Sequence, residues 1–363
     1  FKQKTAYEIM PSLVGSEMCI RDREGDGIGP EIVAATVNVI KAADDCFNLG
    51  LELETADSGL ASLEKNGSTI PDETWEKILA ADGIILGPCH TAVYPAPEQG
   101  GINPSGRLRT GLDLYANIRP SKIRPGVPAH VEEMDLIIAR ENTEGFYADR
   151  NMHLGSGEFM PTDDIVLAIR KITRKGSEKI ARRACELAAK RRGLLSIVHK
   201  GTVMKVSDGF FAEICKELAS DYNLEVDEYF VDAMAALLVR KPNYFDVIVT
   251  TNMFGDIITD LCAELQGGLG VASSAKLTPQ TGAVLFEPGH GSAPKYSGQG
   301  VANPLAAILT SQLMFEFLQY HEVGAAIENA VRASIVDGQV TRDLGGNLNT
   351  KEVAIAVADR VGG

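Results

Sequence analysis

The stretch Asp246–Glu264, DVIVTTNMFGDIITDLCAE, decides the fold of this chain. Its first six residues form a short run rich in β-branched side chains, which is the composition of a buried strand. From Met253 onward the apolar residues recur with helical spacing, so a helix should follow the strand directly. A strand that leads at once into a helix is the repeating unit of α/β proteins with parallel sheets.

Two aspartates of this stretch suggest a metal site. Asp256 and Asp260 are four residues apart, so a helix places both carboxylates on one face, one turn apart. Two like charges so close are unfavourable without a cation, and Mg²⁺ or Mn²⁺ prefers oxygen ligands of this kind. A solvated acidic helix face is the alternative interpretation. The position just after an apolar strand, where open α/β sheets bind ligands, favours the metal site.

Composition limits the classes of function. The 363 residues can hold two domains of ordinary size, and the net charge of −14 argues against nonspecific binding to nucleic acid. No apolar run approaches the ~20 residues that span a bilayer, so we expect no membrane partner. The six cysteines are scattered and form no CxxC pair, which indicates reduced thiols and a cytoplasmic protein.

The beginning of the chain looks unlike the rest. Residues 1–23, FKQKTAYEIMPSLVGSEMCIRDR, have no sustained period of 2 or 3.6, so we expect a non-native or disordered leader. Beyond it, helical patterns at 31–43 and 71–81 alternate with strand patterns at 51–56 and 82–88. This alternation predicts an α/β fold with a mostly parallel sheet. The glycines at 25, 27 and 29 lack the GxGxxG spacing of a Rossmann fingerprint.

Arginines gather near the predicted strand ends. Arg107, Arg109 and Arg119 lie in one segment, and Arg140 follows the apolar strand DLIIA. The planar fork of arginine suits bidentate binding of carboxylates. A single arginine there is usually an ion-pair partner, but several in an acidic protein fit a di- or tricarboxylate site better.

Together, the motifs resemble one enzyme family. Along the chain stand GDGIGPE, LRTGLDLYANIRP, ARENTEGFY, VHKG, VDAMA, NMFGDIITD, EPGHGSAPKYSGQGVANP and RDLGGN. This set, over about residues 24–363, resembles the β-decarboxylating dehydrogenases, which act on isocitrate, isopropylmalate, homoisocitrate, tartrate or D-malate. The resemblance implies an isopropylmalate/isocitrate dehydrogenase-like fold that binds NAD or NADP without the standard Rossmann motif. Relatives enter GDGIGPE from an apolar strand, which residues 17–23 replace poorly.

The resemblance also implies the domain organisation. A large cofactor-binding domain would comprise residues 24–114 and 267–363, and a small domain for substrate binding and dimerisation would comprise 115–266. The family forms homodimers with shared active sites. By this resemblance, Asp256 and Asp260 bind Mg²⁺ or Mn²⁺ together with Asp232 from the partner subunit, which also supplies Lys200.

The family motifs assign the chemistry to particular side chains. Arg109, Arg119 and Arg140 would bind the malate-like carboxylates of the substrate. Lys200 would serve the removal of the hydroxyl proton as hydride leaves C2 for the nicotinamide. The cation would then stabilise the enolate formed on loss of CO₂, and Tyr147 would donate the proton to C3.

Substrate and cofactor stay open. Asn103 and Ser105, which would contact the substrate, and the additional Arg107 favour a polar, isocitrate-like substrate over isopropylmalate, with tartrate and D-malate as alternatives. Thr202 stands where most relatives have Asn, and its hydroxyl keeps one hydrogen-bonding group but loses the reach of the amide. The residues implied to bind the cofactor are His290, Gly291, Ser292, Ala293, Lys295, Tyr296 and Asn303.

Within the cofactor loop, Lys295-Tyr296 resembles the pair of NADP users. Ala302 and the short turn at 341–346 resemble NAD users, so the balance favours NAD and leaves both open. A non-catalytic regulatory subunit is the alternative from another class. Such subunits usually lose site residues, whereas this chain keeps Tyr147, Lys200 and all three aspartates.

Overall fold

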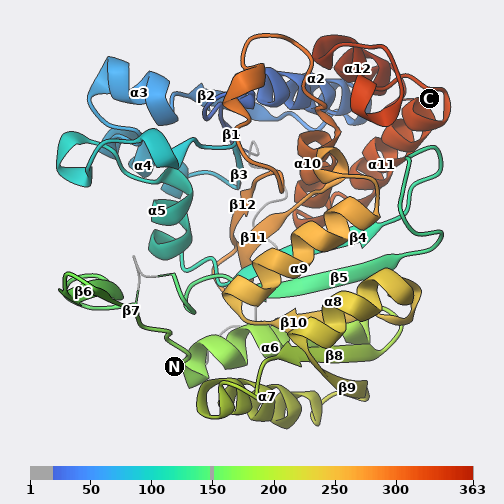
Figure 1. Cartoon of the computed structure of the whole chain (residues 1–363). Helices are drawn as coiled ribbons and strands as arrows, with labels where there is room; N and C mark the ends of the chain where they lie inside the picture. The colour runs from blue at the N-terminus through green and yellow to red at the C-terminus, as the bar shows by residue number, and fades with distance from the viewer. Residues whose placement is uncertain (1–18, 148–150, 363) are drawn as a thin grey trace, which may run out of the picture. The chain divides into compact units, whose positions relative to one another are not determined.

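The stretch that decides the fold forms β10 (Val247–Thr250) followed directly by α9 (Asn252–Leu265), as predicted. β10 is buried throughout, and its neighbours β5 and β8 run parallel to it. The computed structural model describes residues 19–147 and 151–362, in which strands and helices alternate along most of the chain (Figure 1). The predicted α/β class with mostly parallel strands is confirmed.

The described residues form two units. The first contains the chain up to Leu108, the short segment Arg124–Pro128, and the chain from Leu269 onward. The second contains Arg109–Ile123 and Ala129–Gly268. The assignment of one unit to the cofactor and the other to substrate and dimerisation, with the boundaries given above, stays a prediction.

The first unit has five strands in the order β2-β1-β3-β12-β11, and only β11 and β12 pair antiparallel. The strands are β1 (Cys19–Arg23), β2 (Glu52–Ala56), β3 (Gly83–Leu86), β11 (Ala275–Thr278) and β12 (Ala283–Phe286). The α-helices wholly within it are α2 (Gly29–Phe47), α3 (Gly59–Asn66), α4 (Asp72–Leu79), α10 (Leu305–Phe317), α11 (His321–Val336) and α12 (Thr350–Ala358). Its 3-10 turns are η2 (Thr91–Val93), η3 (Pro97–Gln99), η6 (Leu269–Val271), η7 (Pro294–Tyr296) and η8 (Arg342–Leu344). The boundary between the units falls within α5 (Pro104–Gly111).

β1 corrects the expectation of a leader up to residue 23. Residues 19–23 are a strand that pairs with β2 on one side and with β3 on the other. Cys19 and Ile20 are buried. Backbone hydrogen bonds to two neighbours stabilise this strand although its sequence has little β-strand pattern. Residues 1–18 of the predicted leader lie outside the described residues.

The second unit has the strand order β4-β5-β10-β8-β9, with only β4 and β5 antiparallel. These strands are β4 (Ala116–Lys122), β5 (Asp135–Glu141), β8 (Leu194–His199), β9 (Glu225–Phe230) and β10. The helices are α6 (Arg174–Ala189), α7 (Lys205–Ala219), α8 (Val231–Arg240), α9 and the 3-10 turn η5 (Pro242–Tyr244). Buried residues of β5, β8 and β10 pack with residues of α8 and α9, among them Ile138, Val198, Ile248, Leu238 and Ile258.

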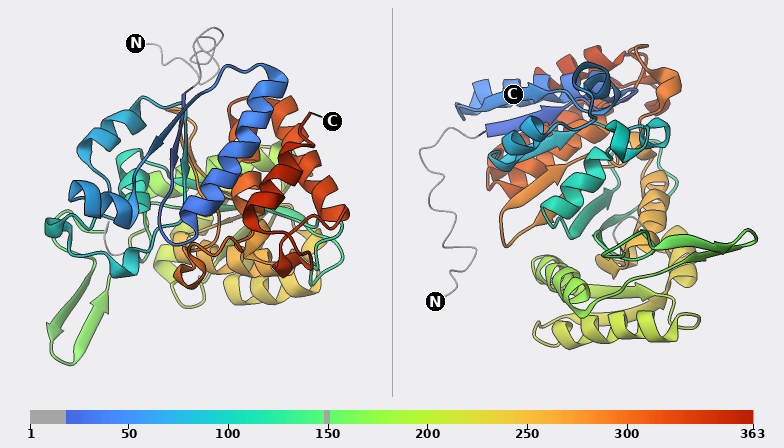
Figure 2. Two further views of the ribbon diagram at one scale, coloured as in Figure 1. Left: turned by 90° about the horizontal axis from the view of Figure 1, so that it is seen from above. Right: turned by 90° about the vertical axis from the view of Figure 1, so that its left-hand side faces the viewer.

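A two-stranded hairpin belongs to the second unit but not to its main sheet. It consists of β6 (Glu158–Thr162) and β7 (Ile165–Ala168), and every residue of both strands is exposed. Figure 2 shows it extending away from the helices of its own unit. In the part of the chain that the structure describes, no helix combines the length and apolarity needed to cross a membrane.

Candidate functional site

Three parallel strands of the second unit end together at the edge where α9 begins. Thr250 of β10 is level with Arg140 of β5 and with Val198 of β8. Arg140 therefore lies at this edge, and Lys200 leaves the sheet two residues after Val198. The carboxyl edge of parallel strands is where open α/β sheets bind ligands.

The register of β4 brings a second arginine to Arg140. Asn117 of β4 pairs with Arg140, and Arg119 lies two residues further along the same face. Arg119 Nε donates to Asn117 Oδ1 over 3.1 Å. Arg109, near the end of α5, acts electrostatically on Arg119 as well. The three predicted substrate arginines thus influence one another.

This clustering changes the pKa of Arg119. Burial, then the positive charges of Arg140 and Arg109, lower the pKa of Arg119 to about 10, against the opposing effect of Asp256 and Asp260. Guanidinium groups that repel one another in a buried place are stabilised by an anion. The cluster therefore has the charge that a di- or tricarboxylate would neutralise.

Arg140 connects the strand edge to Tyr147 and to α9. Its side chain is 2% exposed, and it forms an ion pair with Asp256. Its Nε and Nη2 donate to Asn252 Oδ1 over 3.0 and 2.7 Å, and Nη2 donates to Tyr147 Oη over 2.6 Å. The Tyr147 hydroxyl in turn donates to Asp256 Oδ2 over 3.0 Å. Asn252, the first residue of α9, begins the motif NMFGDIITD, but the sequence analysis gave it no role.

The same neighbours act on the tyrosine. Burial raises the pKa of Tyr147 and the nearby Asp256 raises it further, while Arg140 and Arg109 lower it. The phenol is therefore protonated at neutral pH and can act as a proton donor.

Asp256 and Asp260 lie one turn apart on α9, as the spacing predicts. Asp256 is 48% exposed although its partner Arg140 is buried. Partial burial and the negative charge of Asp256 raise the pKa of Asp260, and Arg119 and Arg140 oppose this. Two carboxylates one helical turn apart are a donor set that fits a hard divalent cation.

The third predicted metal ligand, Asp232, forms an ion pair with Lys200. Lys200 Nζ contacts Asp232 Oδ1 at 2.5 Å, and this contact lowers the pKa of Asp232. Within the described ranges, no group of three or more His, Cys, Asp or Glu residues could hold a metal ion. One chain therefore presents two sets of predicted site residues, one around Asp256 and one around Lys200. Thr202 is exposed in the turn that follows Lys200.

The predicted cofactor loop packs on the GDGIGPE loop in the first unit. Ile28 N–H donates to the Ser292 carbonyl over 2.9 Å, and a Cβ at Gly27 would lie 2.0 Å from that oxygen. Gly27 has a φ of +62°, so both its space and its conformation require glycine. The three glycines of this motif thus include one whose role is close packing of two loops.

The remaining cofactor-loop residues lie as follows. Ala293 has a positive φ of 38° and precedes η7, where the exposed Lys295 places its Nζ 4.6 Å from the centre of the Tyr296 ring. His290 Nδ1 is 3.0 Å from the Gly291 carbonyl. Asn303 Nδ2 donates to Asp343 Oδ2 over 2.8 Å, which joins this loop to η8.

The predicted substrate residues of the first unit already have structural partners. Asn103 Oδ1 accepts from the Gly106 N–H over 3.0 Å at the start of α5. Ser105 donates to Glu287 Oε2 over 2.9 Å and accepts from Lys276 Nζ over 3.2 Å. Lys276 is 1% exposed and forms an ion pair with Glu287. Glu287 is the first residue of the motif EPGHGSAPKYSGQGVANP, but the sequence did not indicate that it pairs with Lys276.

Arg107 also has partners within its own unit. Its Nη2 donates to Asp72 over 2.8 Å, and its guanidinium lies 5.0 Å from the centre of the Trp75 ring. These contacts stabilise α5 against α4 and do not by themselves support the polar-substrate argument.

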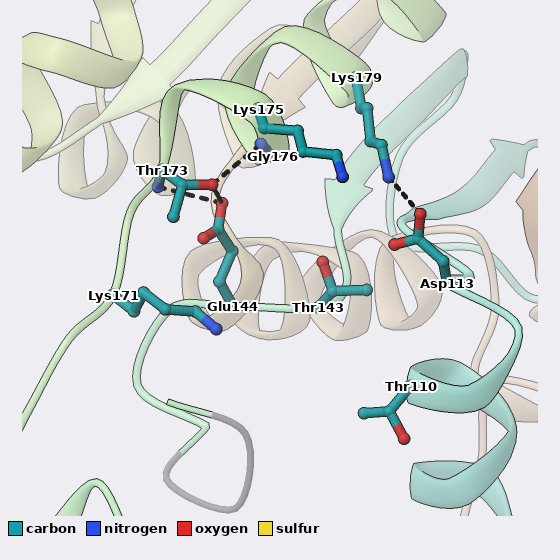
Figure 3. Close-up of a pocket in the computed structure, with 9 residues that line it drawn as sticks. All are labelled: Thr110, Asp113, Thr143, Glu144, Lys171, Thr173, Lys175, Gly176 and Lys179. Carbon is teal, nitrogen blue, oxygen red and sulfur yellow. Dashed lines mark hydrogen bonds and ion pairs between the residues drawn. The ribbon is translucent and has the colours of Figure 1, made fainter. Parts of the chain in front are cut away.

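A cavity of about 290 Å³ in the second unit is lined by none of the predicted residues (Figure 3). Lys171, Lys175 and Lys179 line it together with Glu144 and Asp113. Lys179 pairs with Asp113, and Glu144 accepts from the Thr173 N–H and hydroxyl over 3.2 and 3.0 Å. Burial, followed by the charge of Glu141, raises the pKa of Glu144 to about 7.

Comparison with known proteins identifies the family of this chain. The family model described as isocitrate/isopropylmalate dehydrogenase matches residues 20–357. Homoisocitrate dehydrogenase of Methanocaldococcus jannaschii is 39% identical, over 91% of this chain and 94% of that protein. 3-Isopropylmalate dehydrogenase of Archaeoglobus fulgidus is 41% identical, over 92% and 96%.

Structural comparison gives the same family. The crystal structure of isocitrate dehydrogenase from Methylococcus capsulatus has a TM-score of 0.86 at 38% identity, covering 95% of this chain and all of that chain. The resemblance drawn from the motifs and the fold that it implied are confirmed. The chain belongs to the isocitrate/isopropylmalate dehydrogenase family, a family of decarboxylating dehydrogenases.

Proposed function

We propose that this protein catalyses the metal-dependent oxidative decarboxylation of a malate-type 2-hydroxy-3-carboxy acid, with hydride transfer to NAD or NADP. The observation that carries the proposal is the meeting of Arg140, Arg119 and Arg109 with Tyr147 and Asp256. Guanidinium groups, the Tyr147 hydroxyl as a proton donor and the Asp256 carboxylate lie close together near one sheet edge. Family membership supplies the reaction class.

In this proposal the arginines bind and orient the substrate. Arg119 and Arg140 are buried and held by Asn117 and Asn252, so their guanidinium groups are fixed before substrate binds. Bidentate contacts to C1 and C3 carboxylates would hold the 2-hydroxy acid in one orientation. Preorganised cations of this kind reduce the reorganisation needed in the transition state.

Two groups move protons. Lys200 would serve the removal of the C2 hydroxyl proton, and Tyr147 would return a proton to C3 after CO₂ has left. Burial keeps the phenol protonated at neutral pH, which suits the second role.

Asp256 and Asp260 would hold Mg²⁺ or Mn²⁺, which when bound supplies Lewis-acid stabilisation of negative charge on the substrate oxygen. The loop containing His290, Ser292 and Lys295 would hold the nicotinamide cofactor, which when bound accepts the hydride. The ion pair between Arg140 and Asp256 gives the carboxylate a partner that a divalent cation can replace.

A second copy of the chain would complete the site. Lys200 and Asp232 form their own pair, and we propose that they serve the partner subunit in a homodimer. Exposed apolar side chains support such a partner. They include Val203 and Val206 beside the Lys200 turn, Met253 and Ile257 on α9, and Phe159, Met160, Ile165, Val166 and Leu167 of the hairpin. Exposed apolar groups are stabilised when a partner covers them, so they favour association.

An isocitrate-like polar substrate is favoured because Ser105 and Asn103 are polar where isopropylmalate enzymes place apolar residues. Isopropylmalate, tartrate and D-malate are the alternatives, and the names of the relatives above, which include homoisocitrate and 3-isopropylmalate, support further acids of this class. NAD is favoured over NADP, with Lys295 as the contrary feature. None of the six cysteines, all of which lie in the described residues, is in a disulfide, which is consistent with the cytoplasmic location that we propose.

The test is a substrate panel. Reduction of NAD⁺ and NADP⁺ is followed by the absorbance of the reduced nicotinamide. The acids are isocitrate, isopropylmalate, homoisocitrate, tartrate and D-malate, each with Mg²⁺ or EDTA. Cation-dependent turnover of one acid supports the proposal. Binding of a metabolite without turnover of any acid favours the regulatory subunit instead.

A further inference from the structure

Arg170 contacts the segments of the second unit that carry the predicted site residues Lys200, Tyr147 and Asp256. These segments are called the catalytic segments below. Arg170 follows the hairpin strand β7, and its side chain is buried. The guanidinium forms an ion pair with Asp208, which is 0% exposed. Its Nη1 also donates to Ser207 Oγ over 2.9 Å and its Nη2 to Thr251 Oγ1 over 3.0 Å. One side chain thereby joins α7 to the start of α9.

Asp208 connects this arginine to the Lys200 turn. Its second oxygen accepts a hydrogen bond from the Lys200 backbone N–H over 2.5 Å. The acceptor side chain is fully buried, and this bond fixes the direction in which the chain leaves β8. The Lys200 side chain starts from that fixed backbone position.

Arg170 also contacts the segments that carry Tyr147 and Asp256. Its guanidinium carbon lies 5.6 Å from the centre of the Phe146 ring and 5.4 Å from the centre of the Phe254 ring. Phe146 directly precedes Tyr147, and Phe254 lies two residues before Asp256. Cation–π contacts of a desolvated arginine contribute to holding both rings.

We propose that Arg170 and Asp208 are positioning residues that couple the Lys200 turn to the Tyr147 and Asp256 segments of the same subunit. This inference rests on the proposed function. If Lys200 serves the partner's site and Tyr147 serves its own, the Arg170–Asp208 pair connects the two active sites of a homodimer. Among the described residues, the hydrogen bonds and the ion pair of Arg170 go to α7, Met204 and Thr251 and not to Arg109, Arg119 or Arg140, so we expect its loss to affect proton transfer more than substrate binding.

The first experiment compares Arg170→Met with a matched control, Arg191→Met. Arg191 Nε also pairs, over 2.7 Å, with a fully buried aspartate of this unit, Asp246, but it contacts none of the catalytic segments. The control therefore removes an ion pair to a buried aspartate, together with a second pair to Asp135 at the start of β5. We expect Arg170→Met to lower kcat on the order of 10²-fold with KM changed by less than about twofold, because misplaced proton-handling groups affect turnover more than ground-state binding. Arg191→Met should keep the wild-type kcat.

Melting temperatures of both variants separate catalysis from folding, and assays are run below both transitions. Arg170→Lys is the milder variant: it keeps a charge towards Asp208 but cannot reproduce the fork to Ser207 and Thr251. We expect it to lose about tenfold in kcat at nearly constant KM. An unchanged kcat in Arg170→Lys, or a kcat loss in Arg170→Met no larger than in Arg191→Met, would overturn the inference.

Mixed dimers test the coupling itself. A dimer of Arg170→Met with wild type should fall well below half of wild-type activity, because the variant subunit damages its own site through Tyr147 and its partner's through Lys200. A dimer of Tyr147→Phe with wild type keeps one intact site and should retain about half. Half activity in the first dimer contradicts the coupling. Absence of wild-type turnover on every acid contradicts the proposed function instead, so the two failures are distinguishable.

Discussion

The hydroxyl of Tyr147 donates a hydrogen bond to Asp256 Oδ2 over 3.0 Å and accepts one from Arg140 over 2.6 Å. The proton-donating residue, a predicted metal ligand and a predicted carboxylate-binding residue are therefore in direct contact. Replacing any one of them should alter the other two.

Asp256→Asn should lower turnover by orders of magnitude while the melting temperature changes little. The amide keeps the size of the side chain and can still accept from Tyr147, but it removes the charge that a divalent cation needs. Its half-exposed position limits the effect on stability. Glu264→Gln, an exposed carboxylate further along α9, is the control. Full turnover of Asp256→Asn in EDTA would disprove the metal assignment.

Lys200→Met and Tyr147→Phe should fail at different steps. Without Lys200 the hydroxyl proton is not removed, so both hydride transfer and CO₂ release should stop. Without the phenol, hydride transfer should be spared relative to protonation at C3. Single-turnover measurements of cofactor reduction and of hydrogen incorporation at C3 separate the two. Equal defects of both variants in both partial reactions would contradict separate roles.

Mixing Lys200→Met with Asp256→Asn subunits should restore activity if sites are shared. In such a heterodimer one active site contains both substitutions and the other contains neither. Activity is measured after subunit exchange has been demonstrated with differently tagged chains. No recovery would argue against a site built from two subunits.

Glu144→Gln should flatten the dependence of stability on pH. The folded-state pKa of Glu144 is raised to about 7 from an unfolded value near 4.5, so the folded protein binds this proton more tightly. Its contribution is therefore fully present below the unfolded value and is lost as pH rises towards 7. The loss amounts to at most about 3 kcal/mol.

The glutamine keeps an oxygen that accepts from Thr173, so the variant should gain stability relative to wild type above pH ~7. Denaturant titrations from pH ~4 to ~8 measure this. The exposed Glu132→Gln serves as the control. Parallel pH curves for Glu144→Gln and wild type would show that the carboxyl is not held protonated.

Lys295→Asp should move cofactor preference towards NAD⁺. If Lys295 faces the adenosine ribose, aspartate repels a 2′-phosphate and accepts from a 2′-hydroxyl. A charge-assisted hydrogen bond contributes roughly 1.5–3 kcal/mol, so the ratio of kcat/KM for the two cofactors should shift at least about tenfold. An unchanged ratio would place Lys295 away from the ribose.

The sequence was most informative where a local pattern is enough. Strand β10 and helix α9 follow from a β-branched run and from helical spacing, and the one-turn separation of Asp256 and Asp260 follows from the helix itself. β1 was missed because its stability comes from pairing with β2 and β3, which local periodicity does not report.

Contacts between distant residues were not predictable. Arg140 and Asn252 are separated by 112 positions, and Ser105 and Glu287 by 182. The resemblance assigned Ser105 to substrate, yet the fold places it against a buried Lys276–Glu287 pair, and only Glu287 of that pair stands in a quoted motif. The Arg170–Asp208 pair could not be predicted either, because a lone arginine after an exposed strand is expected to be a surface residue.

The most direct test of the central claim is the stoichiometry of a single reaction. Purified protein, its preferred acid, oxidised cofactor and Mg²⁺ are mixed, and reduced cofactor and released CO₂ are measured in the same sample. The account predicts one CO₂ for each reduced cofactor, and neither product when EDTA replaces Mg²⁺. Reduced cofactor without CO₂, or equal turnover in EDTA, would contradict it.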